Sequence, residues 1–258
     1  MSIATESGHW YKPDGTPAYE IEKAKGGLRP ATLRDARKLG LFPSVTGVIR
    51  EAAQPGIVWW LNENMAKAAV KVQRLADESE ESWLGRIRLE ANVLGELARE
   101  RGTQIQAAIE WGFGGLPMGD LAPFAVPVIE WVEKEFPGWE TYPEKSFAHN
   151  TLGYGGKLDL ALNLGDRWAI IDFKTTDKDL AAVKGYESHI MQLAACADGL
   201  GVDFSNCFFI NLFVSSVTPG EIKPLYWEEG DADNAWQMFL GLLRYWKFKR
   251  KYFPGRSE

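Results

Sequence analysis

Cysteine is scarce in this sequence, which has only Cys196 and Cys207 among its 258 residues. Two cysteines are too few for a disulfide framework, a four-cysteine metal site or a cysteine-ligated iron–sulfur cluster. Long apolar runs are missing as well, since none approaches the ~18 residues of a membrane-spanning helix. The N-terminal stretch MSIATESGHW lacks the charged and apolar blocks of a signal peptide. We therefore expect a reducing, cytoplasmic setting and no membrane partner.

Positive charge is also in short supply. The chain has 29 Lys and Arg against 35 Asp and Glu, a net charge of −6. This balance argues mildly against a nucleic-acid partner, because phosphate binding depends mainly on Lys and Arg. The basic residues nevertheless gather in short clusters, such as Lys247 to Lys251, so locally positive tracks remain open. With 45% hydrophobic and 25% charged residues, the composition is that of an ordinary globular protein.

The clearest pattern in the chain is a predicted hairpin at residues 154–175. Leucine recurs at every second position from Leu158 to Leu164, which predicts a half-buried strand. A second apolar run follows at 168–174, and Gly165-Asp166 between the two suits a two-residue hairpin turn.

That turn predicts a register. If Leu164 faces Arg167, then Asp159 lies opposite Asp172, with Cβ atoms roughly 4.5–5.5 Å apart. Lys174 lies two residues after Asp172 and therefore points to the same face. Opposed carboxylates repel each other unless a divalent cation lies between them, and carboxylates beside an ammonium group suit metal-assisted hydrolysis. The alternative is a solvated hairpin whose charges face water.

The remaining elements are predicted from apolar periodicity and breaker residues. Ser44 or Thr46 is expected to cap a helix that runs through Trp59, Trp60 and Met65. The two tryptophans could stack on bases, but we expect them in the core, because buried aromatic residues are commoner. Residues 80–111 are predicted to form one or two amphipathic helices, and Gly102-Thr103 would be the break or cap between two. Further helices are predicted within 26–41, where a loop comes first, over 124–136, over 185–200, and from Asp231 or Asp233 onward. Strands are predicted over 142–148, 207–214 and 221–227. A small hairpin is expected over 9–21 and a loop over 112–127.

This order of elements predicts an α/β domain with a mixed sheet flanked by helices, after an N-terminal helical region. A linker long enough to separate two domains is absent. We expect residues 1–41 to form an N-terminal hairpin and short helix that extend a main domain over residues 42–258, in a single globular unit.

Several short motifs resemble those of the PD-(D/E)xK nuclease superfamily. They are G-G-K-L-D ending at Asp159, I-I-D-F-K-T around Asp172, and M-Q-L-A-A around Gln192. The sequence is similar to the RecB-like branch that includes phage exonucleases, and to the mitochondrial genome maintenance exonuclease. Further motifs shared with the latter are P-S-V-T at 43–46, R-G-T-x-x-Q-x-x-x-E at 101–110 and H-x-x-L-x-Y at 149–154. The likeness runs from about residue 42 to residue 252 and implies a restriction-endonuclease-like core, with residues 42–258 as the nuclease domain.

The resemblance implies roles for five residues. Asp159 and Asp172 would bind Mg²⁺ or Mn²⁺, and the backbone carbonyl of Phe173 would be a further ligand. Lys174 would orient the attacking water or help to deprotonate it, and would offset charge on the scissile phosphate. Gln192 would brace Lys174 or contact the DNA.

This chain departs from the relatives at two positions. Gln106 stands where they usually carry a metal-binding His, and its amide oxygen suits hard cations better than softer ones. Cys196 stands where they tend to have Tyr. Glu110, one helical turn from Gln106, could serve as a substitute ligand, and Glu144 is a weaker candidate. These changes leave three readings open: an altered metal preference, a slower enzyme, or a site that binds without cutting.

The sequence thus favours a metal-dependent deoxyribonuclease, most simply an exonuclease that acts on DNA ends or single strands and leaves 5′-phosphates. One alternative is a catalytically weak protein that binds DNA ends. The other is an endonuclease of the same superfamily. The resemblance is compatible with a bacterial or phage-infected host cell and with a recombination partner protein. It does not predict an oligomeric state.

Overall fold

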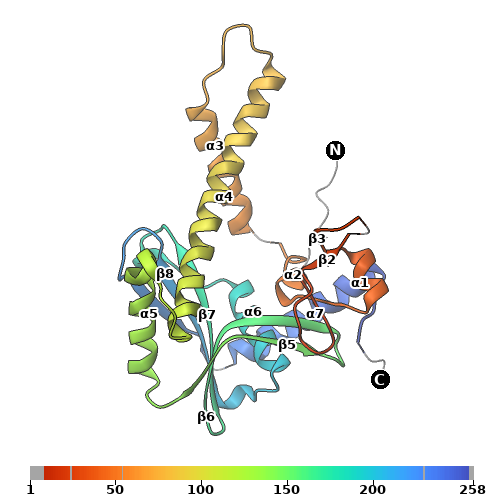
Figure 1. Ribbon diagram of the computed structural model, residues 1–258, viewed down its shortest axis with the longest axis vertical. Coiled ribbons are helices and arrows are strands. Elements are labelled where there is room, and N and C mark those ends of the chain that lie inside the picture. Colours follow the sequence, from red (N-terminus) through yellow and green to blue (C-terminus); the bar gives the residue numbers. More distant parts are fainter. Residues whose placement is uncertain (1–8, 24, 54, 229, 256–258) are drawn as a thin grey trace.

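The computed structural model describes residues 9–23, 25–53, 55–228 and 230–255. Its centre is a five-stranded sheet in the order β5-β6-β7-β8-β9, which helices flank on both faces (Figure 1). The β7–β8 pair is parallel and the other neighbouring pairs are antiparallel, so the predicted mixed α/β sheet is confirmed. The strands are β5 (Glu140–His149), β6 (Tyr154–Leu164), β7 (Arg167–Thr176), β8 (Cys207–Ser215) and β9 (Ile222–Tyr226).

The β6–β7 hairpin has the predicted turn. Leu164 pairs with Arg167, and Gly165 adopts a positive φ of +67° that a glycine tolerates without strain. The ladder between the two strands, however, ends at Leu160–Ile171, one step before the predicted Asp159–Asp172 pair. The two strands have begun to diverge there, because β6 continues along β5 while β7 continues along β8.

Strand β6 is covered on both faces, so the prediction of a half-buried strand was wrong. Leu158 and Ala161 belong to a core with helices α6 and α7, whereas Leu160 and Leu162 belong to a second core with α4 and α5. Alternation in sequence cannot distinguish a solvent-exposed face from one that a second layer of helices covers. These helices are α4 (Glu80–Phe113), α5 (Ala122–Glu135), α6 (Glu187–Gly199) and α7 (Asp231–Arg250).

The N-terminal part packs against this sheet through several small elements. The predicted hairpin over 9–21 has only an isolated Tyr11–Pro17 bridge; β1 pairs instead with β4, and β2 with β3. A parallel bridge from Ser44 to Gly155 joins the region to β6, and Trp10 is buried in the core of α6 and α7. The elements are β1 (Trp10–Tyr11), β2 (Glu20–Glu22), β3 (Leu28–Pro30), α1 (Leu33–Leu39), β4 (Phe42–Pro43) and α2 (Val45–Ile49).

Two helix boundaries differ from the expectation. Ser44 does cap a helix, with its Oγ accepting from Gly47 N at 2.9 Å, but that helix is α2, which ends at Ile49 before a separate α3 (Pro55–Lys71). The predicted break at Gly102 is absent, since α4 is one continuous helix. The physical reason for that glycine is close packing: a Cβ at Gly102 would lie 2.5 Å from Thr175 Oγ1 on β7.

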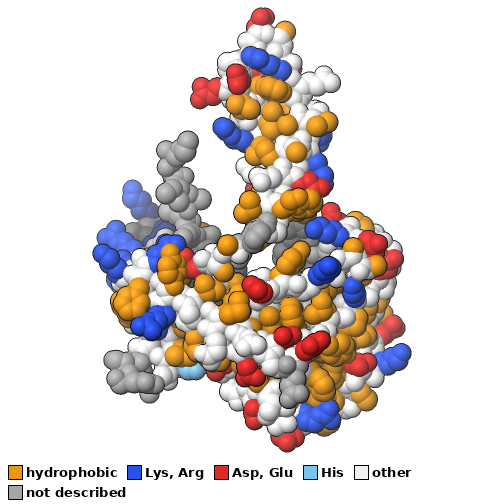
Figure 2. All heavy atoms as spheres, turned by 180° about the vertical axis from the view of Figure 1, so that it is seen from behind, with side chains coloured by type: hydrophobic (Ala, Val, Ile, Leu, Met, Phe, Trp, Pro, Cys, Tyr) orange, Lys and Arg blue, Asp and Glu red, His pale blue; other side chains and the backbone are white. Residues whose placement is uncertain are grey.

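Helix α3 and the first half of α4 project from the body as a helical hairpin (Figure 1). The buried apolar cluster between them is small and consists of Ala68, Ile87 and Ala91. Trp59 is 57% exposed, so its predicted place in the core was wrong, and Trp60 is half-buried. Figure 2 shows hydrophobic side chains along this hairpin; the exposed ones include Ile57, Val58, Leu61, Leu89, Val93 and Leu97.

Smaller deviations occur after residue 111. Part of the predicted 112–127 loop is helical, because η1 (Gly119–Leu121) leads directly into α5, which includes Pro127. Gly230, rather than an Asp, is the N-cap of α7. Short 3₁₀ turns η2 (Leu180–Ala182) and η3 (Phe204–Asn206) flank α6. Among the helices in the described part of the chain, none combines the length and apolarity that crossing a bilayer requires.

Candidate functional site

Asp172 is the centre of a buried hydrogen-bond network on β7. Its side chain is almost fully buried, and three neighbours donate to its carboxylate. Lys174 Nζ lies 2.9 Å from Oδ1 and 2.8 Å from Oδ2. Gln192 Nε2 donates to Oδ1 and Asn211 Nδ2 donates to Oδ2, each at 2.8 Å. A buried carboxylate with this many donors is fully satisfied as an anion.

Lys174 is held by the same network. It projects from β7 to the same face as Asp172, as the alternation of the strand predicts, and its Nζ also donates to Gln192 Oε1 at 3.2 Å. Burial alone would lower the pKa of Lys174, but attraction to Asp172 and Asp159 outweighs burial and raises it. The lysine is therefore a cation at neutral pH. The structure thus brings Asp172, Lys174 and Gln192 into direct contact.

Asp159 reaches the site from β6, where the strands diverge. Its Oδ2 accepts a hydrogen bond of 2.7 Å from the backbone N–H of Phe173. Burial, and then repulsion from the Asp172 carboxylate, raise the pKa of Asp159 to about 7. The site thus holds two carboxylates whose burial and mutual repulsion outweigh the attraction of Lys174 at Asp159.

Gln106 contacts the same residue, Phe173, at its backbone carbonyl. From α4 its Nε2 donates to the backbone carbonyl of Phe173 at 2.8 Å. The carbonyl that the resemblance implies as a metal ligand is therefore already a hydrogen-bond acceptor. Amide orientation in Gln follows from the surrounding network, so a ligand at this carbonyl would favour the turned amide, with its oxygen toward the site.

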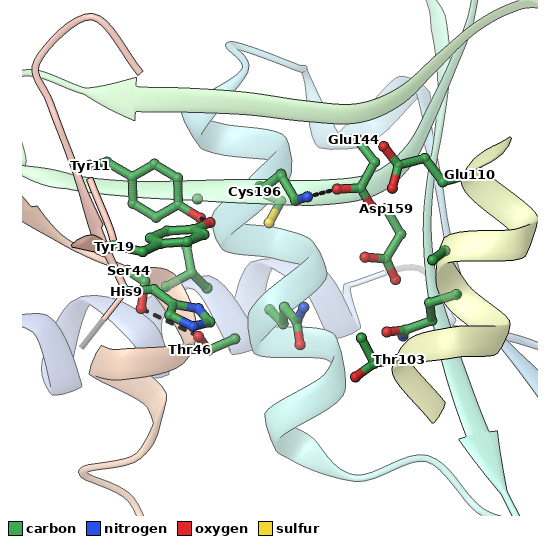
Figure 3. A pocket seen from close by; sticks show the side chains of 16 residues that line it. His9, Tyr11, Tyr19, Ser44, Thr46, Thr103, Glu110, Glu144, Asp159 and Cys196 are labelled. Atoms are coloured by element: carbon green, nitrogen blue, oxygen red, sulfur yellow. Dashed lines mark hydrogen bonds and ion pairs between the residues drawn. The ribbon is translucent and has the colours of Figure 1, made fainter. Parts of the chain in front are cut away.

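A cavity of about 350 Å³ opens above these residues. Asp159, Gln106 and Gln192 line it, together with Glu110, an exposed residue on α4. In Figure 3 the carboxylates of Glu110, Glu144 and Asp159 lie on one side of this cavity. Asp172 and Lys174 do not line it: Asp172 is buried, whereas the Lys174 side chain is 27% exposed.

Glu144 occupies an unusual backbone position beside the cavity. It forms an ion pair with Lys157 of β6, and its φ of +53° is rare for a residue with a side chain. Its neighbours Pro143 and Lys145 pair with Leu160 and Leu158, so Glu144 stands across from Asp159. Backbone strain of this kind is found preferentially at functional sites.

The donor set at this site is made of oxygen atoms. In the described residues, no group of three or more His, Cys, Asp and Glu side chains is placed to hold a metal ion. Two carboxylates, the Phe173 carbonyl and the Gln106 amide would have to serve instead, with water. This composition fits Mg²⁺, which keeps several waters and commonly uses only one or two carboxylates, and it also suits Mn²⁺.

Two residues that the sequence pattern did not single out complete the network. Asn211 is fully buried on β8, directly beside Asp172 in the parallel register. Its Oδ1 accepts from Trp227 Nε1 at 2.8 Å while its Nδ2 holds Asp172. One signal was available: Asn211 is the polar residue within the apolar run F-F-I-N-L-F-V, and a buried amide needs partners.

Four other residues near the site are His149, Tyr154, Cys196 and His189. His149 stacks on Tyr154 and lies 3.3 Å from Asp198, and the Tyr154 hydroxyl donates to Asp198, so both pack beside the hairpin. Burial raises the pKa of the Cys196 thiol, which keeps it neutral. His189 is neutral as well, since burial and then Lys174 lower its pKa to about 4.

Comparison with known proteins adds little to this picture. No protein-family model and no curated protein matches the chain. A solved structure from Eubacterium rectale, named provisionally as an exonuclease, is 14% identical with a TM-score of 0.41 over 58% of this chain and 68% of its own. The structure of SSO0001 is 12% identical with a TM-score of 0.29 over 72% of this chain and 85% of its own. With TM-scores below 0.5, neither likeness bears on the fold or the activity of this chain.

Proposed function

We propose that this chain is a metal-dependent deoxyribonuclease, most simply an exonuclease that acts on DNA ends or single strands. The observation that carries the proposal is the contact of Lys174 with both oxygens of Asp172, beside a second carboxylate, Asp159, that lines an open cavity. The resemblance of the surrounding motifs to PD-(D/E)xK nucleases supports the same conclusion. A phosphodiester is the substrate for which such carboxylates and an ammonium group are jointly useful.

Asp159, Asp172 and the carbonyl of Phe173 would hold Mg²⁺ or Mn²⁺. Such an ion supplies, when bound, an activated water and neutralisation of the phosphate charge. Both oxygens of Asp172 already accept two contacts each, from Lys174, Gln192 and Asn211. A further ligand on Asp172 therefore requires Lys174 to give up one of its contacts, which frees the ammonium group for the phosphate.

Lys174 is suited to charge stabilisation more than to proton removal. Its pKa is raised by the two carboxylates, so it stays protonated. Water would attack phosphorus in line, and the leaving 3′-oxygen would give a 5′-phosphate product. Lys174 would stabilise the charge that develops on the phosphate, while Gln192 keeps the ammonium group in position.

The test is degradation of end-labelled single-stranded DNA in Mg²⁺ or Mn²⁺. We expect the wild type to degrade it, and Asp172→Asn and Lys174→Ala each to lower the rate by at least ~10²-fold, the usual scale for such catalytic groups. Asp166→Asn, in the exposed hairpin turn, and Lys184→Ala, exposed after β7, are matched controls that should keep the wild-type rate. Equal cutting by the site variants with retained folding would place the activity elsewhere.

A protein that binds DNA ends without cutting them is the second candidate. Two observations favour it: Gln106 occupies the Phe173 carbonyl, and Asp172 is fully hydrogen-bonded. DNA binding without turnover in either metal, with cutting gained by Gln106→His, would support this alternative. A covalently closed circle separates the remaining choice, because only an endonuclease can cut a substrate without ends.

A further inference from the structure

The cavity above Asp159 has a second wall, made by the N-terminal part of the chain. His9, Tyr11 and Tyr19 line the same space as Asp159 and Glu110. Figure 3 shows the two groups on opposite sides of the cavity, with Cys196 of α6 between them. The aromatic wall therefore faces the candidate catalytic residues across a single compartment.

The aromatic side chains of this wall form an ordered array. His9 stacks on Tyr19 with ring centroids 4.4 Å apart and an interplanar angle of 25°. Tyr19 meets Tyr11 edge to face, and their hydroxyls share a hydrogen bond of 2.7 Å. Because Tyr11 is only 2% exposed, it fixes the outer two rings in place. His9 itself is exposed and Tyr19 is half-buried, so a ligand can contact both rings. We call the stacked pair of His9 and Tyr19 the aromatic shelf.

The charges near the shelf suit a phosphate-linked ligand. Part of the His9 ring is covered by protein although the residue has exposed surface. This partial burial, and then the cations Arg50 and Lys157, lower the pKa of His9, which leaves the imidazole neutral. A neutral ring can stack and hydrogen-bond, and the Arg50 cation attracts a phosphate, whereas Lys157 is already paired with Glu144. Aromatic faces near positive groups are how proteins hold unpaired bases, since every base has a π-face that can stack.

The volume of the cavity fits a single nucleotide. A cavity of about 350 Å³ lies within the range of small-molecule sites and is far too small for a base pair with its backbone. A base inside a duplex stacks on its neighbours and cannot also stack on protein rings unless it leaves the helix.

We infer that His9 and Tyr19 form a base-stacking subsite that holds one unpaired nucleobase while its phosphate lies at Asp159 and Lys174. This inference rests on the proposed nuclease function. The substrate nucleotide beside the scissile bond must then be unstacked, and recognition depends on the presence of a base.

The first experiment measures cleavage of a labelled single strand in which one abasic residue is moved stepwise along the end. For the wild type we expect one position at which the abasic residue lowers kcat/KM by roughly 5- to 150-fold, the scale of base–aromatic stacking. Tyr19→Leu should cause a similar loss on the intact strand and no further loss on the abasic strand. Tyr19→Phe keeps the ring and should restore the sensitivity to the abasic residue. Tyr245→Leu, at an exposed ring on α7, is the matched control.

The second experiment measures binding without cutting, in Ca²⁺, with 2-aminopurine at the sensitive position, or at each end position in turn if no cleavage is seen. Stacking should quench the fluorescence of 2-aminopurine when the wild type binds, but not when Tyr19→Leu or His9→Ala binds. Circular dichroism reports whether each variant folds. If Tyr19→Leu does not fold, His9→Ala provides the comparison. Equal cleavage of intact and abasic strands by the wild type would overturn the subsite while the nuclease stands. No cleavage with retained quenching would overturn the nuclease and keep the subsite, and no quenching with the wild type would overturn the subsite.

Discussion

Individual residues in this site depend on one another, and Asn211 illustrates this most clearly. Its amide joins Asp172 to Trp227 through two hydrogen bonds of 2.8 Å inside the protein. Asp172 cannot turn to water instead, because Asp172 and Asn211 are both buried. The amide therefore contributes to stability and to the position of the carboxylate at once.

We predict that Asn211→Leu lowers the free energy of unfolding by about 1–3 kcal/mol, since it leaves a buried acceptor and a donor without partners. Cleavage should slow as well, because Asp172 loses one of its three donors. Urea denaturation and the labelled-DNA rate measure the two effects. Asn234→Leu, at an exposed position on α7, should change stability by less than ~0.5 kcal/mol. A variant as stable as the wild type would show that this amide does not support the site.

The raised pKa of Asp159 makes the free energy of unfolding of the metal-free protein depend on pH. Its pKa is raised to about 7 in the folded state, against 3.8 for the ordinary group, so the folded chain keeps a proton that the unfolded chain releases. The wild type should therefore lose stability as the pH rises from about 4 to about 7.

Asp159→Asn removes this titration. In EDTA it should be more stable than the wild type at pH 8, by roughly 1–3 kcal/mol, with the difference shrinking toward pH 4. Denaturant unfolding at several pH values measures this difference. The same difference at pH 4 and pH 8 would contradict the raised pKa of Asp159, whose causes are burial and then repulsion from Asp172.

At the scale of elements, the contact between α4 and β7 positions Gln106 over the hairpin. Gly102 allows this contact, because any Cβ there would meet Thr175 Oγ1 at 2.5 Å. Gly85 lies on the same helix at a position where a Cβ would extend into open space, and thus provides a matched comparison.

We predict opposite signs for two substitutions on this helix. Gly85→Ala should stabilise the protein by about 0.5–1 kcal/mol through helix propensity, whereas Gly102→Ala should destabilise it by about 1–3 kcal/mol through overpacking. Thr175→Ala in the Gly102→Ala background should recover most of the loss. Thermal or urea unfolding measures all three, and equal effects at Gly85 and Gly102 would refute the role given to the close contact.

The elements also show what local sequence can predict. The β6–β7 turn, the strands and α6 follow from apolar alternation, Gly165-Asp166 and helical periodicity, all of which are local signals. The exposure of Trp59 and Leu97 does not follow from them, because the pattern of α3 and α4 is amphipathic whether its apolar face meets a sheet or solvent. The apolar face of the α3–α4 hairpin meets solvent because this hairpin projects from the body of the protein (Figure 1), which is a feature of the tertiary structure.

At the scale of the whole molecule, the candidate site is built from parts that are distant in sequence. The contact of Lys174 with Asp172 was predictable because the two are neighbours on one strand. Asn211 reaches Asp172 only through the parallel β7–β8 pairing, and Gln106 reaches Phe173 from a helix 67 positions earlier. The cavity wall formed by His9 and Tyr19 depends on how the N-terminal part packs against the rest of the chain. Apolar periodicity does not predict this packing.

The most direct test of the central claim is a titration of Mn²⁺ followed by electron paramagnetic resonance, which detects the free ion. The two carboxylates should bind Mn²⁺ in the wild type at pH 8, with affinity at least ~10-fold weaker in Asp159→Asn and in Asp172→Asn. Asp166→Asn, outside the site, should bind as the wild type does. Unchanged binding in both site variants would contradict the account, because the ion would then lie somewhere other than between Asp159 and Asp172.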